Sequence, residues 1–318
     1  MATLLPAPGE PDACYLVDLS GWARAAWEVC PPTRAENGER VEVVRAVVAR
    51  LVRLLVDQEP AYLGIAADTP GRVWQHELWP AYKAARREPG EDYHAQVTRL
   101  FEVFALHRIP VFRAPGHQAD DLLAAAATLA RGAGLRVVIV SRDRDLWQLL
   151  DEAGEVIAWD GKAPTAIGAP EVRAHHEGVG PALLADLHAL VGHEGKAPGV
   201  EGVGLKTAAR MLLRHGSLEE VLRTWQWHAG KLGPAIRDGA AAARLSRQLV
   251  GLRADAPIDF DLEALRLGWG HDDAAALRRL GVTLGIRSMI DVEALPKGAP
   301  RGVAGGVPGG GRSRATAP

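Results

Sequence analysis

The sequence has very few cysteines. Among its 318 residues only Cys14 and Cys30 are cysteines, and they do not form a CxxC pair. Neither a structural zinc site nor a framework of disulfides is therefore expected. The first twelve residues contain no basic segment and no long apolar run, so we expect no signal peptide and no membrane span. A reducing, cytoplasmic compartment is the default expectation.

The chain also has little net charge. Its 37 Lys and Arg residues almost balance 39 Asp and Glu residues, which leaves a formal charge of −2. Any contact with nucleic acid must therefore come from local basic patches. The hydrophobic fraction of 47% is ample for a buried core in one large domain or two smaller ones. No motif indicates a polymerase domain.

Apolar runs that alternate with helical patterns indicate an α/β fold with a mostly parallel central sheet flanked by helices. Strands are predicted at residues 14–19, 61–67, 109–113, 135–141 and 156–159. Helices are predicted at residues 41–57, at 92–107 and within GHQADDLLAAAATLARGAG, where the acids lie in the first turn of the helix. We expect an α/β domain over residues 1–175, a helical region over 176–295 and a disordered, Gly- and Pro-rich tail over 296–318.

Acidic residues follow three of the predicted strands, at Asp18, Asp68 and Asp143. Parallel strands place their carboxyl ends on one edge of the sheet, where ligands bind. Asp120 and Asp121 open a helix at the same edge, and Asp145 follows closely. Six clustered carboxylates repel one another, and divalent Mg²⁺ or Mn²⁺ relieves that repulsion. The alternative for each residue alone is a turn former or a helix cap.

A glycine-rich string, PGVEGVGLKTA, occupies residues 198–208 and is typical of a helix–hairpin–helix turn. Its glycines permit tight turns and close backbone approach, and the helix that follows presents free N–H groups to an anion. Lys206 and Thr207 can add contacts to phosphates, which position DNA without reading its sequence. The alternative is an ordinary connection between helices. Residues 201–253 contain nine Lys and Arg residues but only four Asp and Glu residues, so this segment is basic.

A second basic candidate is the segment from Tyr82 to Arg87, with sequence YKAARR. Lys83 and Arg86 lie three residues apart, so we predict that they share a helix face. Most such runs are merely solvated charged surfaces.

Five of these strings, in this order, resemble the 5′-nuclease (flap endonuclease) superfamily, which includes the 5′-nuclease domain of bacterial DNA polymerase I. They are YLVDLS, AADTPGRVWQHELWPAYKAARR, GHQADDLLAAAATLA, VVIVSRDRDLWQLL and PGVEGVGLKTA. The resemblance spans about residues 14 to 260. It implies a PIN-like nuclease core with an arch or clamp near residues 72–95, followed by a helix–three-turn–helix DNA-binding unit. It also implies metal-dependent hydrolysis of DNA at 5′ ends, flaps and branches. We further expect a monomer that does not bind membranes.

The resemblance assigns roles to matched residues. The metal-site residues are Asp18, Asp68, Asp120, Asp121, Asp143 and Asp145. Catalytic contacts to the scissile phosphate fall to Lys83 and Arg86. The DNA-binding residues are Tyr82, Arg87, Gly199, Gly202, Gly204, Lys206 and Thr207. The implied cofactors are Mg²⁺ or Mn²⁺, with K⁺ at the glycine-rich turn.

Two departures from the family pattern weaken the expected second metal site. Gln118 stands where the family usually has Glu. The family's GDxxDN string before the glycine-rich turn is replaced by residues 192–197, GHEGKA, so both of its aspartates are absent. Glu194 is available but shifted, and Lys196 could supply positive charge in place of a cation.

The leading hypothesis is a metal-dependent 5′-3′ exonuclease or flap endonuclease. The alternatives are an impaired protein that binds branched or nicked DNA without cleaving it, and a related ribonuclease.

Overall fold

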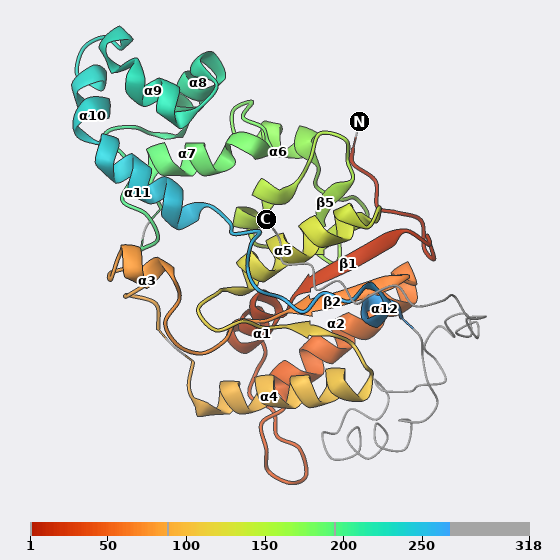
Figure 1. Cartoon of the computed structure of the whole chain (residues 1–318). Coiled ribbons are helices and arrows are strands. Elements are labelled where there is room, and N and C mark those ends of the chain that lie inside the picture. Colours follow the sequence, from red (N-terminus) through yellow and green to blue (C-terminus); the bar gives the residue numbers. More distant parts are fainter. Residues whose placement is uncertain (1, 88, 194, 268–318) are drawn as a thin grey trace.

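A computed structural model of the chain describes residues 2–87, 89–193 and 195–267. The predicted tail at 296–318 lies outside the described residues. Figure 1 shows a central sheet with helices on both faces and a group of helices that projects from one end. No helix of the described part is long and apolar enough to cross a membrane.

The first half of the chain alternates strands and helices. The elements are β1 (Ala13–Asp18), α1 (Leu19–Val29), α2 (Glu42–Gln58), β2 (Tyr62–Ala66), α3 (Gln75–Leu78), α4 (Glu91–Leu106), β3 (Val111–Phe112), α5 (Ala119–Gly132), β4 (Arg136–Val140), the 3-10 helix η1 (Arg144–Leu149) and β5 (Val156–Trp159). All five strands pair in parallel in the order β3-β2-β1-β4-β5. The predicted fold class is therefore confirmed.

The sheet is buried on both faces, as expected for parallel strands covered by crossover helices. On β1, Cys14 and Leu16 face a core shared with α5 and the C-terminal helices. Tyr15 and Val17 alternate with them and face a second core built with α1, α2 and α4. Strand order reverses between β1 and β4, so the carboxyl edge has a switch point there, which is the usual ligand position in such sheets.

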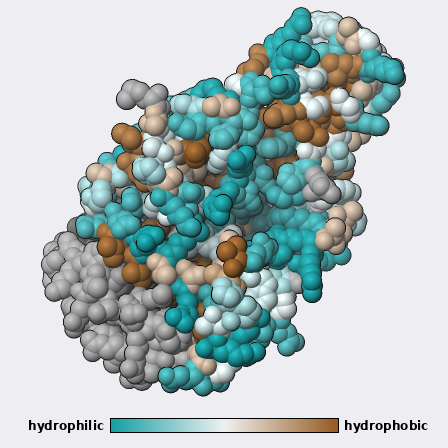
Figure 2. Space-filling model, turned by 180° about the vertical axis from the view of Figure 1, so that it is seen from behind, coloured by the Kyte–Doolittle hydropathy of each residue, from teal (hydrophilic) through white to brown (hydrophobic). Residues whose placement is uncertain are grey.

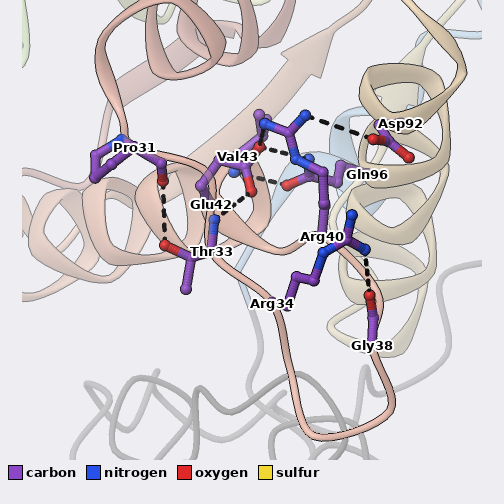
Figure 3. A network of polar contacts seen from close by, with 9 residues as sticks. All are labelled: Pro31, Thr33, Arg34, Gly38, Arg40, Glu42, Val43, Asp92 and Gln96. Carbon is purple, nitrogen blue, oxygen red and sulfur yellow. Dashed lines mark hydrogen bonds and ion pairs between the residues drawn. The ribbon is translucent and has the colours of Figure 1, made fainter.

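A buried polar network fixes α4 against α2 (Figure 3). Glu42, at the start of α2, accepts hydrogen bonds from the Thr33 N–H at 3.1 Å and from the Gln96 amide at 3.2 Å, and it pairs with Arg40. Gln96 in turn accepts from the Val43 N–H at 2.7 Å. Because these buried groups are paired, the network positions the helix that follows the 72–90 segment without an unsatisfied charge.

The second half is helical. It contains α6 (Ala169–His175), η2 (Pro181–Leu183), α7 (Leu184–Val191), α8 (Leu205–His215), α9 (Leu218–Arg223), η3 (Trp225–Trp227), α10 (Leu232–Asp238), α11 (Ala240–Val250) and α12 (Leu262–Leu265). Helices α7 and α11 connect the sheet to the projecting group α8–α10 (Figure 1). Figure 2 shows hydrophobic residues on that projecting part, where Leu213 and Trp227 are among the exposed large apolar side chains.

One local prediction is wrong. Lys83 and Arg86 do not share a helix face, because residues 80–85 form turns and Lys83 has a left-handed φ of +53°. A lysine pays a steric penalty in that conformation, and the Lys83 N–H bond to the Gly195 carbonyl at 2.6 Å stabilises it.

Candidate active site

A cavity of about 810 Å³ lies at the carboxyl edge of the sheet. Four of the predicted aspartates line it: Asp18, Asp68, Asp120 and Asp143. They come from the ends of β1, β2 and β4 and from the start of α5, so the switch point brings together residues up to 125 positions apart. Basic side chains line the same cavity: Arg24, Arg50, Lys83, Arg86, Arg142 and Lys196.

Asp18 is the last residue of β1 and caps α1. It accepts hydrogen bonds from the Gly21 N–H and from the Ser141 hydroxyl, both at 2.7 Å. Burial raises the pKa of Asp18 to about 6, with the nearby charges of Asp68 and Asp143 adding to the shift against the two hydrogen bonds. Asp18 is therefore both a helix cap, as the alternative interpretation had it, and a member of the acidic cavity.

Asp68 follows strand β2, and Asp120 lies in the first turn of α5. The Asp68 carboxylate accepts from the Ala119 N–H at 2.7 Å, at the first residue of α5. The pKa of Asp120 is raised well above its usual value, first by burial and then by Asp143, Asp18 and Asp68. Such mutual repulsion is the signature of carboxylates that share a site.

Asp143 and Asp145 belong to the turn between β4 and β5. Asp143 caps η1 by accepting from the Asp145 N–H at 2.9 Å. Asp145 does not line the large cavity, and it pairs at 2.6 Å with the ammonium of Lys196, which does. Burial alone would raise the pKa of Asp145, but Lys196 outweighs it and holds that pKa below its usual value.

Asp121 does not line the large cavity, although it lines a small adjoining one together with Asp120 and Asp145. It is 1% exposed. One oxygen accepts from the Trp74 indole N–H at 2.9 Å and from the Gln118 N–H at 3.3 Å, and the other accepts from the Arg253 N–H at 3.0 Å. Both oxygens are thus engaged in joining the start of α5 to two distant segments.

Lys83 reaches the cavity from the 72–90 segment. Its ammonium donates to the Gln118 amide oxygen and lies 5.1 Å from the centre of the Tyr82 ring. Gln118 donates in turn to the Tyr82 hydroxyl at 3.2 Å. Tyr82 is buried, so its ring supports Lys83 rather than presenting an open stacking face. The amide at position 118 orients the lysine without neutralising it.

Arg86 and Arg87 are both exposed. Arg86 lines the cavity, whereas Arg87 does not. The Arg87 carbonyl accepts from the Arg24 guanidinium at 3.0 Å, which ties this segment to α1.

The donor set suits a hard divalent ion, since it consists of carboxylate oxygens. Within the described residues, no three His, Cys, Asp or Glu side chains form a ready-made ligand set. Mg²⁺ usually keeps several waters and binds proteins through one or two carboxylates together with substrate phosphates. Carboxylates that line a wide cavity without converging fit that mode of binding. Burial first, and neighbouring carboxylates second, raise the pKa values of Asp18 and Asp120, and a bound cation would favour the ionised form of both.

The glycine-rich turn lies at the start of α8. Gly199 has a φ of +70°, and a Cβ there would meet the Gly192 backbone nitrogen at 2.5 Å, so only glycine allows this approach. Gly202 also has a left-handed φ, of +77°, whereas Gly204 does not and precedes the first turn of α8. Lys206 is exposed and Thr207 half-buried in that first turn.

The prediction from sequence missed two groups of residues. Arg210 and Arg214 follow Lys206 at four-residue spacing and are exposed on α8, so the three form a basic stripe that helical periodicity could have revealed. Arg24, Arg50 and Arg142 line the cavity, and no local pattern marks them. Arg50 lies over the Trp22 ring at 4.2 Å.

A parallel sheet with an acidic cavity at its switch point, joined to a helical unit with a glycine-rich turn, defines a two-part α/β nuclease-like class. The chain belongs to the 5′-3′ exonuclease family. Residues 13–177 match the model of its N-terminal resolvase-like domain, and residues 179–273 match its C-terminal SAM fold. The predicted superfamily is therefore confirmed.

Relatives and solved structures agree with this assignment. The chain is 35% identical to DNA polymerase I of Rhizobium leguminosarum over 80% of this chain and 26% of the relative. It is 32% identical to DNA polymerase I of Deinococcus radiodurans over 84% of this chain and 28% of the relative. The chain thus spans between a quarter and a third of the length of these relatives.

The fold is similar to that of the T5 D15 protein co-crystallized with metal ions, with a TM-score of 0.65 and 16% identity. The match covers 88% of this chain and 98% of the T5 chain. It is also similar to the catalytic core of Rad2 in complex with DNA substrate, with a TM-score of 0.60 and 14% identity. That match covers 92% of this chain and 96% of the Rad2 chain.

Proposed function

We propose that this chain is a divalent-metal-dependent 5′-3′ exonuclease or 5′-flap endonuclease that hydrolyses phosphodiester bonds in DNA. The observation that carries the proposal is the set of four carboxylates, from separate strand ends, in one cavity that basic residues also line. Family membership and the solved neighbours described with metal ions and with DNA support it.

The residues present suggest how the work is divided. Asp18, Asp68, Asp120 and Asp143 would hold Mg²⁺ or Mn²⁺. Such an ion, when bound, activates water and stabilises the charge of a phosphodiester transition state. Lys83, oriented by Gln118, would donate to a phosphate oxygen.

On the exposed rim, Arg86 would add charge attraction for the strand. Preorganised cations of this kind favour the transition state because they face the position where negative charge develops.

DNA is held further away, on the helical unit. The exposed stripe of Lys206, Arg210 and Arg214 would contact duplex phosphates beside the glycine-rich turn, where we also place K⁺. A monomeric state and a cytoplasmic location are parts of the proposal that rest on the sequence alone.

Cleavage of an end-labelled 5′-flap duplex by the purified protein tests the proposal. Products should form with Mg²⁺ or Mn²⁺ and disappear with a chelator, and Asp143→Ala should lose at least a hundredfold in rate. Asp57→Ala is the matched control, because Asp57 is exposed near the end of α2 on the opposite edge of the sheet. Equal cleavage by wild type and Asp143→Ala would refute the proposal.

A second candidate is a binder of branched DNA that does not cleave it. It is favoured by the neutral Gln118 and by the Asp145–Lys196 ion pair, each of which lowers the negative charge available to metal. Salt-sensitive junction binding without any metal-dependent product would select this candidate.

A further inference from the structure

Lys196 stands out among the basic residues of the cavity because it is built into the acidic cluster. Its ammonium lies 2.6 Å from Asp145, and the two side chains are only 22% and 21% exposed. It lines both the large cavity and a small adjoining one that Asp120, Asp121 and Asp145 also line. An ion pair withdrawn from solvent in this way is a fixed feature of the site rather than a surface contact.

The backbone holds Lys196 in place. His193 and Ala197 exchange two hydrogen bonds, at 2.9 and 2.8 Å, which close a tight loop around it. The Gly195 carbonyl accepts from the Lys83 N–H at 2.6 Å. The two lysines of the site are therefore carried by segments that are bonded to each other, and Lys196 has little freedom to leave.

The surroundings keep Lys196 charged. Burial would lower its pKa, but the carboxylates of Asp145, Asp143 and Asp120 outweigh burial and raise that pKa above its usual value. An ammonium thus lies among the same carboxylates that a cation would be needed to neutralise.

We propose that the Lys196 ammonium is a built-in cation of the active site, which takes the place of a divalent ion beside Asp145. The exchangeable metal is then held by Asp18, Asp68, Asp120 and Asp143. This inference rests on the proposed metal-dependent function and deepens it. It assigns Lys196 as a positioning residue that sets how many metal ions the site takes.

Metal stoichiometry tests the assignment without relying on activity. Binding of Mn²⁺ to the purified protein, followed by electron paramagnetic resonance and by calorimetry, counts ions per chain. Lys196→Gln should bind one more Mn²⁺ than wild type at the same free concentration, because it leaves Asp145 unpaired. Lys196→Arg keeps the charge and should bind the wild-type number. An unchanged count in Lys196→Gln would overturn the assignment, as would an additional ion in Lys196→Arg.

Asp145 provides the second half of the test, which stays informative if Lys196→Gln does not fold. Asp145→Asn alone should keep the wild-type ion count, since Asp145 holds Lys196 and no metal. The double variant Asp145→Asn, Lys196→Gln should lose the additional ion seen in Lys196→Gln. Loss of the wild-type ion in Asp145→Asn would overturn the assignment.

Lys231→Gln, an exposed lysine at the start of α10 and outside both cavities, is the matched control and should leave the count unchanged. A wild type that binds no Mn²⁺ at all contradicts the proposed function itself. A wild type that binds Mn²⁺ while Lys196→Gln gains nothing contradicts only the role of Lys196.

Discussion

At the scale of single residues, Asp18 links the chemistry of the site to the stability of the fold. Its folded pKa of about 6 lies above the ordinary value of 3.8, so the folded state binds the proton more tightly than the unfolded state. The stabilising effect is fully present below about pH 4 and is lost as the pH rises through 6. In the absence of metal, a charged Asp18 therefore weakens the fold at neutral pH.

We predict that Asp18→Asn raises the free energy of unfolding of the metal-free protein at pH 8, by up to about 3 kcal/mol. The gain should shrink towards pH 4, where the wild-type carboxyl is protonated. Urea unfolding with a chelator at several pH values measures it, and Asp57→Asn serves as the control. A difference between variant and wild type that does not change with pH would contradict this account.

Asp121 differs from its neighbour Asp120 in what its oxygens touch. We predict that Asp121→Ala destabilises the protein by about 1–3 kcal/mol, because it leaves the buried Trp74 indole N–H without an acceptor and removes two part-buried hydrogen bonds, from the Gln118 and Arg253 N–H groups. Thermal unfolding measures the loss, with Asp120→Ala as the matched control. Asp120→Ala should not destabilise and should weaken metal binding instead. Equal stability of the two variants would show that the hydrogen bonds of Asp121 matter little.

Residue types alone could not separate these two aspartates. Adjacent helix positions differ by about 100° in direction, so one side chain faces the cavity and the other faces the core. The partners of Asp121 are Trp74 and Arg253, which lie 47 and 132 positions away. Such contacts leave no local trace in the sequence. The charge of Lys196 near the acids could be anticipated only from the family's GDxxDN string, and its pairing with Asp145 in particular could not.

At the scale of elements, helix α8 carries the proposed contact with duplex DNA. We predict that Lys206→Gln weakens binding to all duplex sequences alike and lowers the slope of log affinity against log salt by about 1, as expected for one lost phosphate contact. Fluorescence anisotropy at several salt concentrations measures both. Arg223→Gln is the control, since Arg223 is already paired with Glu220 on α9. An unchanged salt dependence in Lys206→Gln would remove α8 from the interface.

Most elements could be predicted from hydrophobic periodicity. Long buried strands such as β1 and β4 and amphipathic helices such as α2 and α4 lie within a residue or two of their predicted ranges. Helix α1 was not predicted, because it begins directly at Leu19 after β1 with no glycine or proline between them. The sequence predicts a helix where residues 80–85 form turns, because the left-handed conformation of Lys83 depends on a contact with Gly195, far along the chain, that local periodicity does not encode.

At the scale of the whole molecule, the two halves of the chain share one site. The sheet supplies the carboxylates, and the loop that follows α7 supplies Lys196. The two units on either side of the proposed boundary near residue 175 therefore both contribute residues to the cavity. Parallel topology could be predicted from alternating elements, and it places the acids at one edge. The basic lining from α1, α2 and the 141–143 turn depends on tertiary packing that sequence periodicity does not encode.

The most direct test of the account is the position of bound metal in a crystal of the protein soaked with Mn²⁺. Anomalous diffraction should give its strongest peak inside the large cavity, within ligand reach of at least two of Asp18, Asp68, Asp120 and Asp143. A crystal of Asp143→Ala prepared in the same way should show a weaker peak or none. A strongest peak elsewhere, or an equal peak in Asp143→Ala, would contradict the central claim that these distant carboxylates form one metal centre.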